Sequence, residues 1–332
     1  MIVVDKPGML TTVQDLGRHG LRERGICPGG ALDTLALRLA NRLVGNRDDA
    51  AGLEITMGGC ELRFEQDGRI ALAGDDFGAQ LDGAPVWPCW STPVATGQTL
   101  RLGGANKLSA KAGLRSWLAV SGGIDVPLLL GSRSTDLKAG FGGHQGRALK
   151  RGDRLPLGRS ALDAQQQARR AFGLRPPAWN ADCDDEAIAL RVMPGPEYAQ
   201  FTVASRDAFW REPWQITPQS NRMGSRLVGP ELQRLKRSID MLSSGVIPGT
   251  VQVPPSGQPI ILMGDAQTTG GYPRIGVVIR ADQWKLAQAP LKGWLRMVQV
   301  GAAEAHVAWE EQQHYLELVA QGLQAAGWPT AH

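Results

Sequence analysis

Residues 264–276, GDAQTTGGYPRIG, form the loop with the densest set of side chains that could bind a small molecule. The loop lies between the apolar runs PIILM and VVI, which are typical of buried strands. Asp265 ends the first run, where a carboxylate is costly unless it is hydrogen-bonded or binds a ligand. The other polar members of the loop are Gln267, Thr268, Thr269 and Tyr272. Because its paired glycines allow a ligand to approach the backbone, we interpret the loop as a binding wall, with an elaborate hairpin turn as the alternative.

A second polar stretch, TPQSNRMGSRLVG at 217–229, brings Asn221, Arg222 and Arg226 close together in the sequence. Two arginines offer planar forks that match a carboxylate or a phosphate. A solvated loop explains the same composition, so both interpretations stay open.

Three further positions are candidates for binding. Arg18 lies in TTVQDLGRHG at 11–20, which predicts either a ligand rim or a capped turn. Arg147 lies in the glycine-rich stretch 142–153, where it could meet an anion or lock the turn by pairing with Asp153. Gln252 is the polar residue of the short strand TVQV and needs a partner there.

Several common catalytic motifs are absent from the sequence. It has no phosphate-binding P-loop, no dinucleotide-binding GxGxxG, no HExxH and no GxSxG. The five histidines are isolated and the four cysteines form no CxxC pair, so we expect no metal site and no disulfide framework. Free thiols and the lack of a signal peptide favour the cytoplasm.

The composition favours a β-rich globular protein. The 332 residues include 42 glycines and 21 prolines, which predict many tight turns between short strands. The net charge of +4 is dispersed, without the lysine and arginine block of a nucleic-acid-binding protein. No apolar run is long enough to span a membrane.

Three short motifs recur in the same order with offsets of about 184 to 190 residues, as in RLVG at 42–45 and 226–229. This pattern indicates a duplicated β domain. We predict a first domain at 1–165, a linker at 166–187, a second domain at 188–302 and a helical tail at 303–332. Helices are expected at 31–44, at 160–172 with Ser160 as N-cap, and at about 303–326, where the last packs on its own domain or docks a partner.

Long motifs across residues 1–320 resemble the family of 5-oxoprolinase C subunits (PxpC), also called KipA, allophanate hydrolase subunit 2 or the biotin-dependent carboxyltransferase family. They include TTVQDLGRHG, SGGIDVP, GSRSTDLKAG, PGPEY, SNRMG, PGTVQVPP and DAQTTGGYPRIG. The resemblance implies two cyclophilin-like β-barrel domains with a ligand site in the cleft between them. It carries the site over to Asn221, Arg222, Arg226, Gln252, Asp265, Gln267, Thr268, Thr269 and Tyr272, and less directly to Arg18, Asn41, Glu54 and Arg147.

The resemblance also implies an activity. Together with a PxpB-like partner, such a chain uses ATP to phosphorylate and activate 5-oxo-L-proline, and a PxpA-like partner completes ring opening to L-glutamate. Under this hypothesis Arg222 and Arg226 hold the substrate carboxylate or the ATP phosphates, and Asp265 binds Mg²⁺ or accepts a proton. The amide and hydroxyl side chains orient the lactam. ATP with Mg²⁺ is expected at a site shared with the PxpB-like partner.

Two other functions fit the same resemblance. One is a carboxyltransferase component that acts on urea or a similar amide, with biotin carried on another protein. The other is a non-catalytic KipA-like binder of a KipI-like partner.

Overall fold

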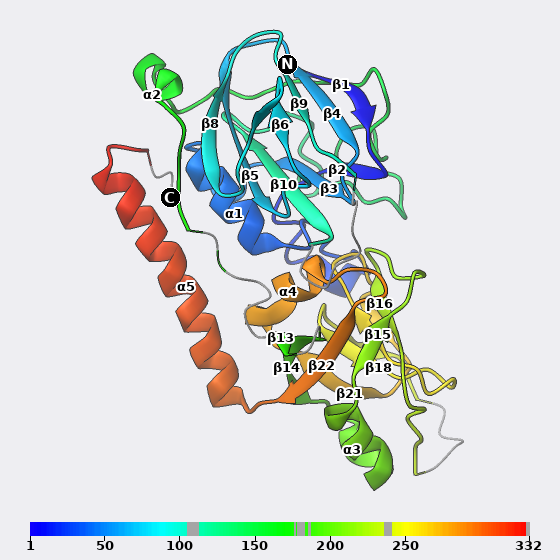
Figure 1. Ribbon diagram of the computed structural model, residues 1–332. Helices are drawn as coiled ribbons and strands as arrows, with labels where there is room; N and C mark the ends of the chain where they lie inside the picture. Colours follow the sequence, from blue (N-terminus) through cyan, green and yellow to red (C-terminus); the bar gives the residue numbers. More distant parts are fainter. Residues whose placement is uncertain (105–112, 176, 178–182, 185–186, 236–240, 330–332) are drawn as a thin grey trace.

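A computed structural model describes residues 1–104, 113–175, 177, 183–184, 187–235 and 241–329 (Figure 1). The predicted mainly β fold is confirmed. Part of the predicted linker and the last residues of the predicted tail lie outside the described residues, and the side chain of Cys183 is not described.

The first domain holds two six-stranded sheets. One has the order β11 (Arg154–Leu155), β1 (Ile2–Pro7), β4 (Cys60–Phe64), β9 (Thr99–Arg101), β6 (Gln80–Leu81) and β7 (Ala84–Pro85). The other has the order β12 (Phe172–Gly173), β8 (Trp90–Val94), β5 (Gly68–Gly74), β10 (Arg115–Val120), β3 (Gly52–Thr56) and β2 (Leu10–Gln14).

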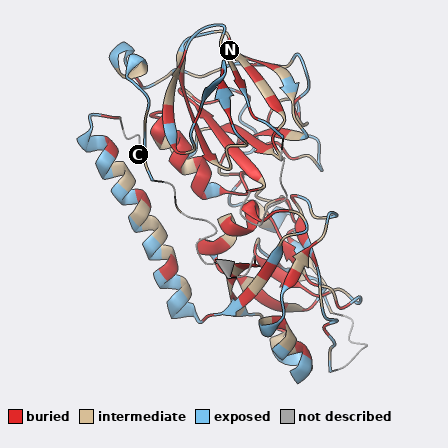
Figure 2. Cartoon of the chain, viewed as in Figure 1, coloured by how far each residue is buried: buried red, intermediate tan, exposed pale blue. Residues whose placement is uncertain are grey.

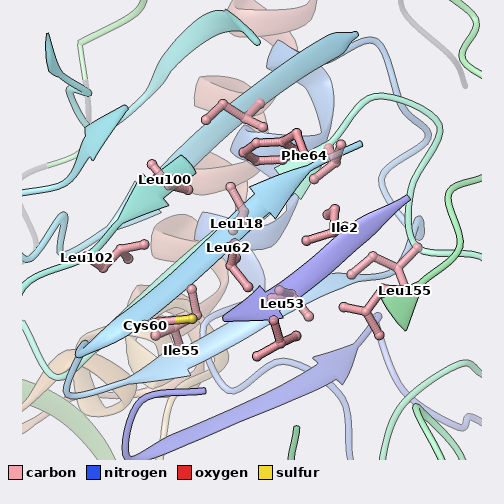
Figure 3. Packing of buried hydrophobic residues seen from close by; sticks show 14 of the residues in the cluster. Ile2, Leu53, Ile55, Cys60, Leu62, Phe64, Leu100, Leu102, Leu118 and Leu155 are labelled. Atoms are coloured by element: carbon pink, nitrogen blue, oxygen red, sulfur yellow. The ribbon is translucent and has the colours of Figure 1, made fainter. Parts of the chain in front are cut away.

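Both sheets enclose one apolar core, shown in Figure 3. In β4, Cys60, Leu62 and Phe64 are buried while the alternate residues Glu61 and Arg63 are half-buried. That alternation is expected for a strand with one covered face. In contrast, all six residues of β10 are buried, because a helix covers its outer face.

That helix is α1 (Thr34–Leu43), which begins three residues after the predicted start at residue 31. Asp33 is its N-cap, and the Asp33 side chain accepts a hydrogen bond from the Ala36 amide. Leu35, Leu39 and Leu43 of α1 pack with alanines of β5 and with Trp117 of β10. This second apolar cluster fixes α1 at the face of the first domain that meets the second domain.

The second domain contains a closed barrel. Its eight-stranded sheet has the order β13 (Cys183–Asp184), β14 (Ala187–Pro194), β21 (Arg274–Val278), β18 (Thr250–Gln252), β19 (Ile260–Leu262), β16 (Gly224–Val228), β15 (Trp214–Ile216) and β22 (Trp294–Gln299). A parallel pairing of β14 with β22 closes seven of these strands into a ring. Trp214, Phe201 and Phe209 fill its core and are fully buried.

Short elements decorate the barrel. They are η2 (Tyr198–Gln200), α3 (Val203–Arg211), the two-stranded pair β17 (Ser244–Gly245) and β20 (Thr269–Gly270), η3 (Arg280–Asp282) and α4 (Gln283–Gln288). Figure 1 shows α4 between the two domains, next to α1.

The C-terminal helix α5 (Ala302–Ala325) confirms the predicted helix at 303–326. It leaves the second domain after β22 and runs along the side of the molecule to the first (Figure 1). Leu316 and Leu323 join the apolar cluster under α1, and Figure 2 shows a few buried positions along a helix that is otherwise exposed or half-buried. The helix therefore packs on both domains of its own chain, rather than on a single domain as one of the two alternatives predicted.

The predicted helix at 160–172 is wrong in extent. Only α2 (Ala164–Ala168) is helical, and its N-cap is Asp163 rather than Ser160. Asp163 and Gln166 form a reciprocal capping box, which fixes the helix start. Phe172 then enters β12 beside Trp90 and Ser91 of β8, so pairing with a strand overrides the local helical pattern.

Candidate active site between the two domains

A buried group of polar side chains joins the two domains. The first domain contributes Asp33, Glu54 and Arg115, and the second contributes Arg222, Asp265 and Gln288. We call these six residues the interdomain polar cluster. Each is at most 6% exposed, so their charges and hydrogen bonds must be satisfied mainly by one another.

Arg222 is the centre of this cluster. It lies just before β16, and its Nε and Nη2 donate to the two carboxylate oxygens of Asp265 at 2.8 and 2.9 Å. Nη1 donates to Glu54 of β3, and Nη2 also donates to the Gly30 carbonyl at 2.6 Å. The forked guanidinium thus binds two carboxylates and a backbone oxygen from both domains.

The negative charges of Glu54 and Asp265 keep Arg222 protonated. Burial alone would lower the pKa of Arg222, but the nearby Glu54 and Asp265 charges outweigh it and raise that pKa. Burial raises the pKa of Asp265, and the Arg222 charge opposes that rise. Arg222 therefore stays positive, and it keeps two carboxylates inside an interface that would otherwise exclude them.

Arg115 extends the cluster toward α4. Its Nε lies 3.7 Å from Glu54 Oε1, and its Nη1 donates to the Ala287 carbonyl. Gln288 at the end of α4 accepts from the Arg115 amide at 3.2 Å and donates to Asp33 Oδ2 at 2.7 Å. The N-cap of α1 in the first domain is thereby bound to α4 in the second.

Asp33 gives the fold a pH dependence that a single substitution should remove. Burial raises the pKa of Asp33 from 3.8 to about 6. Between these two pKa values the Asp33 carboxyl is protonated in the folded state but ionised in the unfolded chain. The contribution of the protonated carboxyl to stability is therefore complete below about pH 4 and is lost as the pH rises through about 6. Relative to Asp33→Asn, the wild type should lose on the order of 2 kcal/mol of unfolding free energy between pH 4 and pH 7.

Urea unfolding of both proteins across this pH range measures the difference. Asparagine also caps helices well, so the variant retains the start of α1. Asp207→Asn, at an exposed position of α3, serves as the matched control. A constant difference between wild type and Asp33→Asn at every pH would contradict the prediction.

The loop 264–276 forms the second domain's wall beside the cluster. Asp265 and Thr268 are buried, whereas the side chains of Gln267, Thr269 and Tyr272 are exposed. Gln252 lies behind the loop, where its amide donates to the Tyr272 carbonyl at 3.4 Å. A Cβ on Gly270 would stand 2.5 Å from the Gln252 amide nitrogen, so this glycine permits the close packing.

Arg18 lies on the first domain's side of the same interface. It is buried, its Nη2 donates to the Ser134 carbonyl at 2.5 Å, and its guanidinium stacks 4.5 Å from the Phe141 ring centroid. A Cβ on Gly29, which has a φ of +60°, would lie 3.7 Å from both Arg18 Nη1 and Asp265 Oδ1. The structure thus brings Arg18, Glu54, Arg222 and Asp265 together across the interface.

Four other candidates lie elsewhere or point outward. Asn41 is on the last turn of α1, where its amide donates to the Ala50 carbonyl at 2.8 Å. Arg147 forms a two-pronged pair with Asp153 at 2.7 and 2.9 Å, which is the turn-locking alternative. Asn221 and Arg226 are exposed, and the Asn221 side chain accepts from the Met223 amide within its own turn.

A groove of about 710 Å³ opens beside the cluster. Its walls come from the loop 16–32 and α1 of the first domain, from loops of the barrel, and from α5. A backbone hydrogen bond from Gly29 N to Gly264 O, 3.0 Å long, links the domains within this lining. Sequence reasoning missed its cations, Arg22, Arg38 and Arg280, because each lies in a short or amphipathic helix whose polar face is normally solvated.

The described part of the chain lacks two kinds of feature. No three His, Cys, Asp or Glu side chains converge there as metal ligands. None of its helices combines the length and apolarity needed to cross a membrane.

Comparison with known proteins gives consistent matches. Residues 24–299 match the family model described as carboxyltransferase domain, subdomain A and B. The chain is 51% identical over 325 residues to the 5-oxoprolinase C subunit of Escherichia coli, covering 97% of this chain and 99% of that protein. It is 40% identical to the 5-oxoprolinase C subunit of Haemophilus influenzae over 308 residues, or 93% of this chain and 94% of that one.

Among solved structures, the urea amidolyase of K. lactis matches with a TM-score of 0.85 and 29% identity. The match covers 96% of this chain and 20% of the urea amidolyase chain. The fold is therefore shared with one segment of a much longer protein.

Proposed function

The chain belongs to the carboxyltransferase domain family, subdomain A and B, and from this premise we propose that it is the C subunit of an ATP-dependent 5-oxoprolinase. The observation that carries the proposal is the 51% identity to a 5-oxoprolinase C subunit over 99% of that protein's length. In this proposal the chain acts with a PxpB-like partner to activate 5-oxo-L-proline, and a PxpA-like partner completes hydrolysis to L-glutamate. The reaction takes place in the cytoplasm.

The interdomain site suits a small planar lactam. The loop 264–276 carries the exposed side chains of Gln267, Thr269 and Tyr272, which supply hydrogen-bonding groups. Arg222 holds this loop in place through its ion pair with Asp265. Groups that are fixed before the substrate arrives lower the barrier by positioning the reacting carbonyl and by meeting charge as it develops. Arg222 contributes by holding this wall in place, because its donors already serve Asp265, Glu54 and Gly30.

The cluster does not fit Mg²⁺. Both oxygens of Asp265 accept hydrogen bonds from Arg222, and Glu54 is bound by Arg222 and by the Leu32 amide at 2.7 Å. Mg²⁺ requires free carboxylate oxygens in octahedral geometry. In this proposal Asp265 therefore does not hold the metal that accompanies ATP.

Reconstitution tests the proposed function. This chain and its PxpB-like and PxpA-like partners from the same organism are combined with ATP and 5-oxoproline, and glutamate is measured. We expect glutamate only when all three proteins and ATP are present. Glutamate formation that continues at the same rate without this chain would refute the proposal, as would a tight complex with the PxpB-like partner that turns nothing over.

A second candidate is a carboxyltransferase component acting on urea or a similar amide. The TM-score of 0.85 to a urea amidolyase and the matching family model favour it. It requires biotin carried on another protein. Transfer of labelled carbon from carboxybiotin to urea, with no glutamate formed from 5-oxoproline, would select this function instead.

A further inference from the structure

The groove between the domains has a cationic lining with no carboxylate of its own. Arg22, Arg38 and Arg280 line it together with His19 and His306, and no Asp or Glu is among the described residues that do so. Arginine charges on the wall of a concave site are expected to attract anions, since the low-dielectric walls concentrate their field.

Arg38 enters the groove from α1 of the first domain. Its nearest carboxylate is Asp48, at 3.9 Å, and Arg42 already binds both oxygens of Asp48 at 2.7 and 2.8 Å. The Arg38 Nε atom is buried without a hydrogen-bond partner among the described residues. Arg38 therefore retains donors that the described part of the protein does not satisfy.

Arg280 approaches from η3 of the second domain. Its guanidinium carbon lies 4.0 Å above the centroid of the Trp309 ring of α5, and no described carboxylate forms an ion pair with it. Burial and the Arg280 charge both lower the pKa of Arg38, with Asp48 opposing them. The two arginines thus repel each other across the groove, and a bound anion would relieve that repulsion.

Arg22 adds a third cation near the same wall. It lies in η1 (Arg22–Arg24) and donates to the Val246 carbonyl, which fixes its side chain across the domain boundary. A phosphate group offers three strong acceptor oxygens and can therefore accept hydrogen bonds from all three guanidinium groups at once, whereas a carboxylate offers two oxygens.

Much of the remaining groove lining is apolar. Among its residues are Leu32, Met193, Ile247, Leu262, Val278 and Leu286. A volume of about 710 Å³ is within the usual range for a site that encloses a small organic ligand. The lining therefore suits a molecule with a flat or apolar body and a multiply charged end.

We propose that this groove is a binding site for a phosphate-bearing ligand, with Arg38 and Arg280 gripping the phosphate from opposite domains and Arg22 assisting. The apolar part of the lining holds the body of the ligand. This proposal concerns binding by the chain alone and holds whether or not the lactam chemistry is correct.

Binding measurements on the purified full chain test this site. The probes are ATP, inorganic tripolyphosphate and 5-oxoproline, each titrated calorimetrically at low salt. We expect ATP and tripolyphosphate to compete with each other, and each of Arg38→Gln and Arg280→Gln to weaken both by about tenfold, as for the loss of one charge-assisted contact. The double variant should bind ATP and tripolyphosphate about a hundredfold more weakly than the wild type. The affinity of the wild type for both should fall as the salt concentration is raised.

Arg101→Gln is the matched control, because Arg101 is an exposed arginine of β9 outside the groove. It removes the same charge and should leave affinity unchanged. ATP should also alter the fluorescence of Trp309, and Trp309→Phe should abolish that change. Thermal melting of each variant separates lost binding from lost folding.

Three results would overturn the proposal. They are no ATP or tripolyphosphate binding by the wild type, equal binding by the folded Arg38→Gln/Arg280→Gln variant, and binding of 5-oxoproline alone with the same dependence on the two arginines. The last would assign the groove to a carboxylate. The 5-oxoprolinase proposal is tested by glutamate formation with the partner proteins, whereas this test measures binding by the chain alone. A negative result here therefore does not refute the 5-oxoprolinase proposal.

Discussion

Replacement of Arg222 by methionine should lower the free energy of unfolding by about 3–5 kcal/mol, the usual cost of breaking a buried ion pair from one side. The variant keeps most of the side-chain length but leaves Asp265 without its ion-pair partner, and Glu54 keeps only Arg115, whose Nε lies 3.7 Å away. Both carboxylates are at most 5% exposed, so water cannot replace the guanidinium without opening the interface. Urea unfolding at neutral pH measures the loss.

Arg226→Met is the matched control for this prediction. Arg226 lies four residues further along, within β16, with an exposed side chain, so its loss should change stability by less than about 0.5 kcal/mol. Combining Arg222→Met with Glu54→Gln and Asp265→Asn should recover part of the stability, because the stranded charges are then gone. A loss below about 1 kcal/mol for Arg222→Met would show that the cluster is not a charged interface in solution.

The second large effect is expected for Asp265→Asn in the reconstituted 5-oxoprolinase. Glutamate formation should fall by about 100-fold or more, as is expected when a change outside the reacting groups misplaces an active site by about 1 Å. Asparagine has only one acceptor oxygen, and its NH₂ group would face the Arg222 donors that now bind both Asp265 oxygens. The loop that carries Gln267 and Thr269 would lose its anchor.

A double-mutant cycle shows how Asp265 acts. If Asp265 works through Arg222, adding Asp265→Asn to Arg222→Gln should cost little further activity. If Asp265 instead contacts the substrate, the two losses should multiply. A near wild-type rate for the single variant Asp265→Asn would remove this residue from the site altogether.

The sequence predicted the local features of this molecule better than its long-range contacts. The mainly β composition and the C-terminal helix follow from turn residues and helical periodicity. The polar loop 264–276 was found because a carboxylate at the end of an apolar strand demands a partner. That partner proved to be Arg222, which the composition of its own loop had also singled out.

The remaining partners could not be predicted from local pattern. Glu54 and Arg222 are 168 residues apart, and Asp33 and Gln288 are 255 apart, so only the folded chain brings them together. Arg147 shows the opposite case, because its partner Asp153 is only six residues away, and the sequence had already suggested this pairing as one of two alternatives. Nothing in the local sequence indicated that Arg38 lines a groove, since an arginine on the polar side of an amphipathic helix normally faces water.

The path of α5 has a consequence for how the protein is made. The apolar cluster under α1 in the first domain includes Leu316, Leu323 and Trp328, and Trp328 donates its indole N–H to the Arg42 carbonyl at 3.2 Å. The ribosome adds these residues after those of both domains, so the outer face of α1 stays uncovered until then. Domains generally fold from the N-terminus onward as they emerge, but here the first domain is completed only after the second has been made. Nascent chains that stop before residue 316 should therefore remain protease-sensitive at α1, whereas released full-length chains should be protected there.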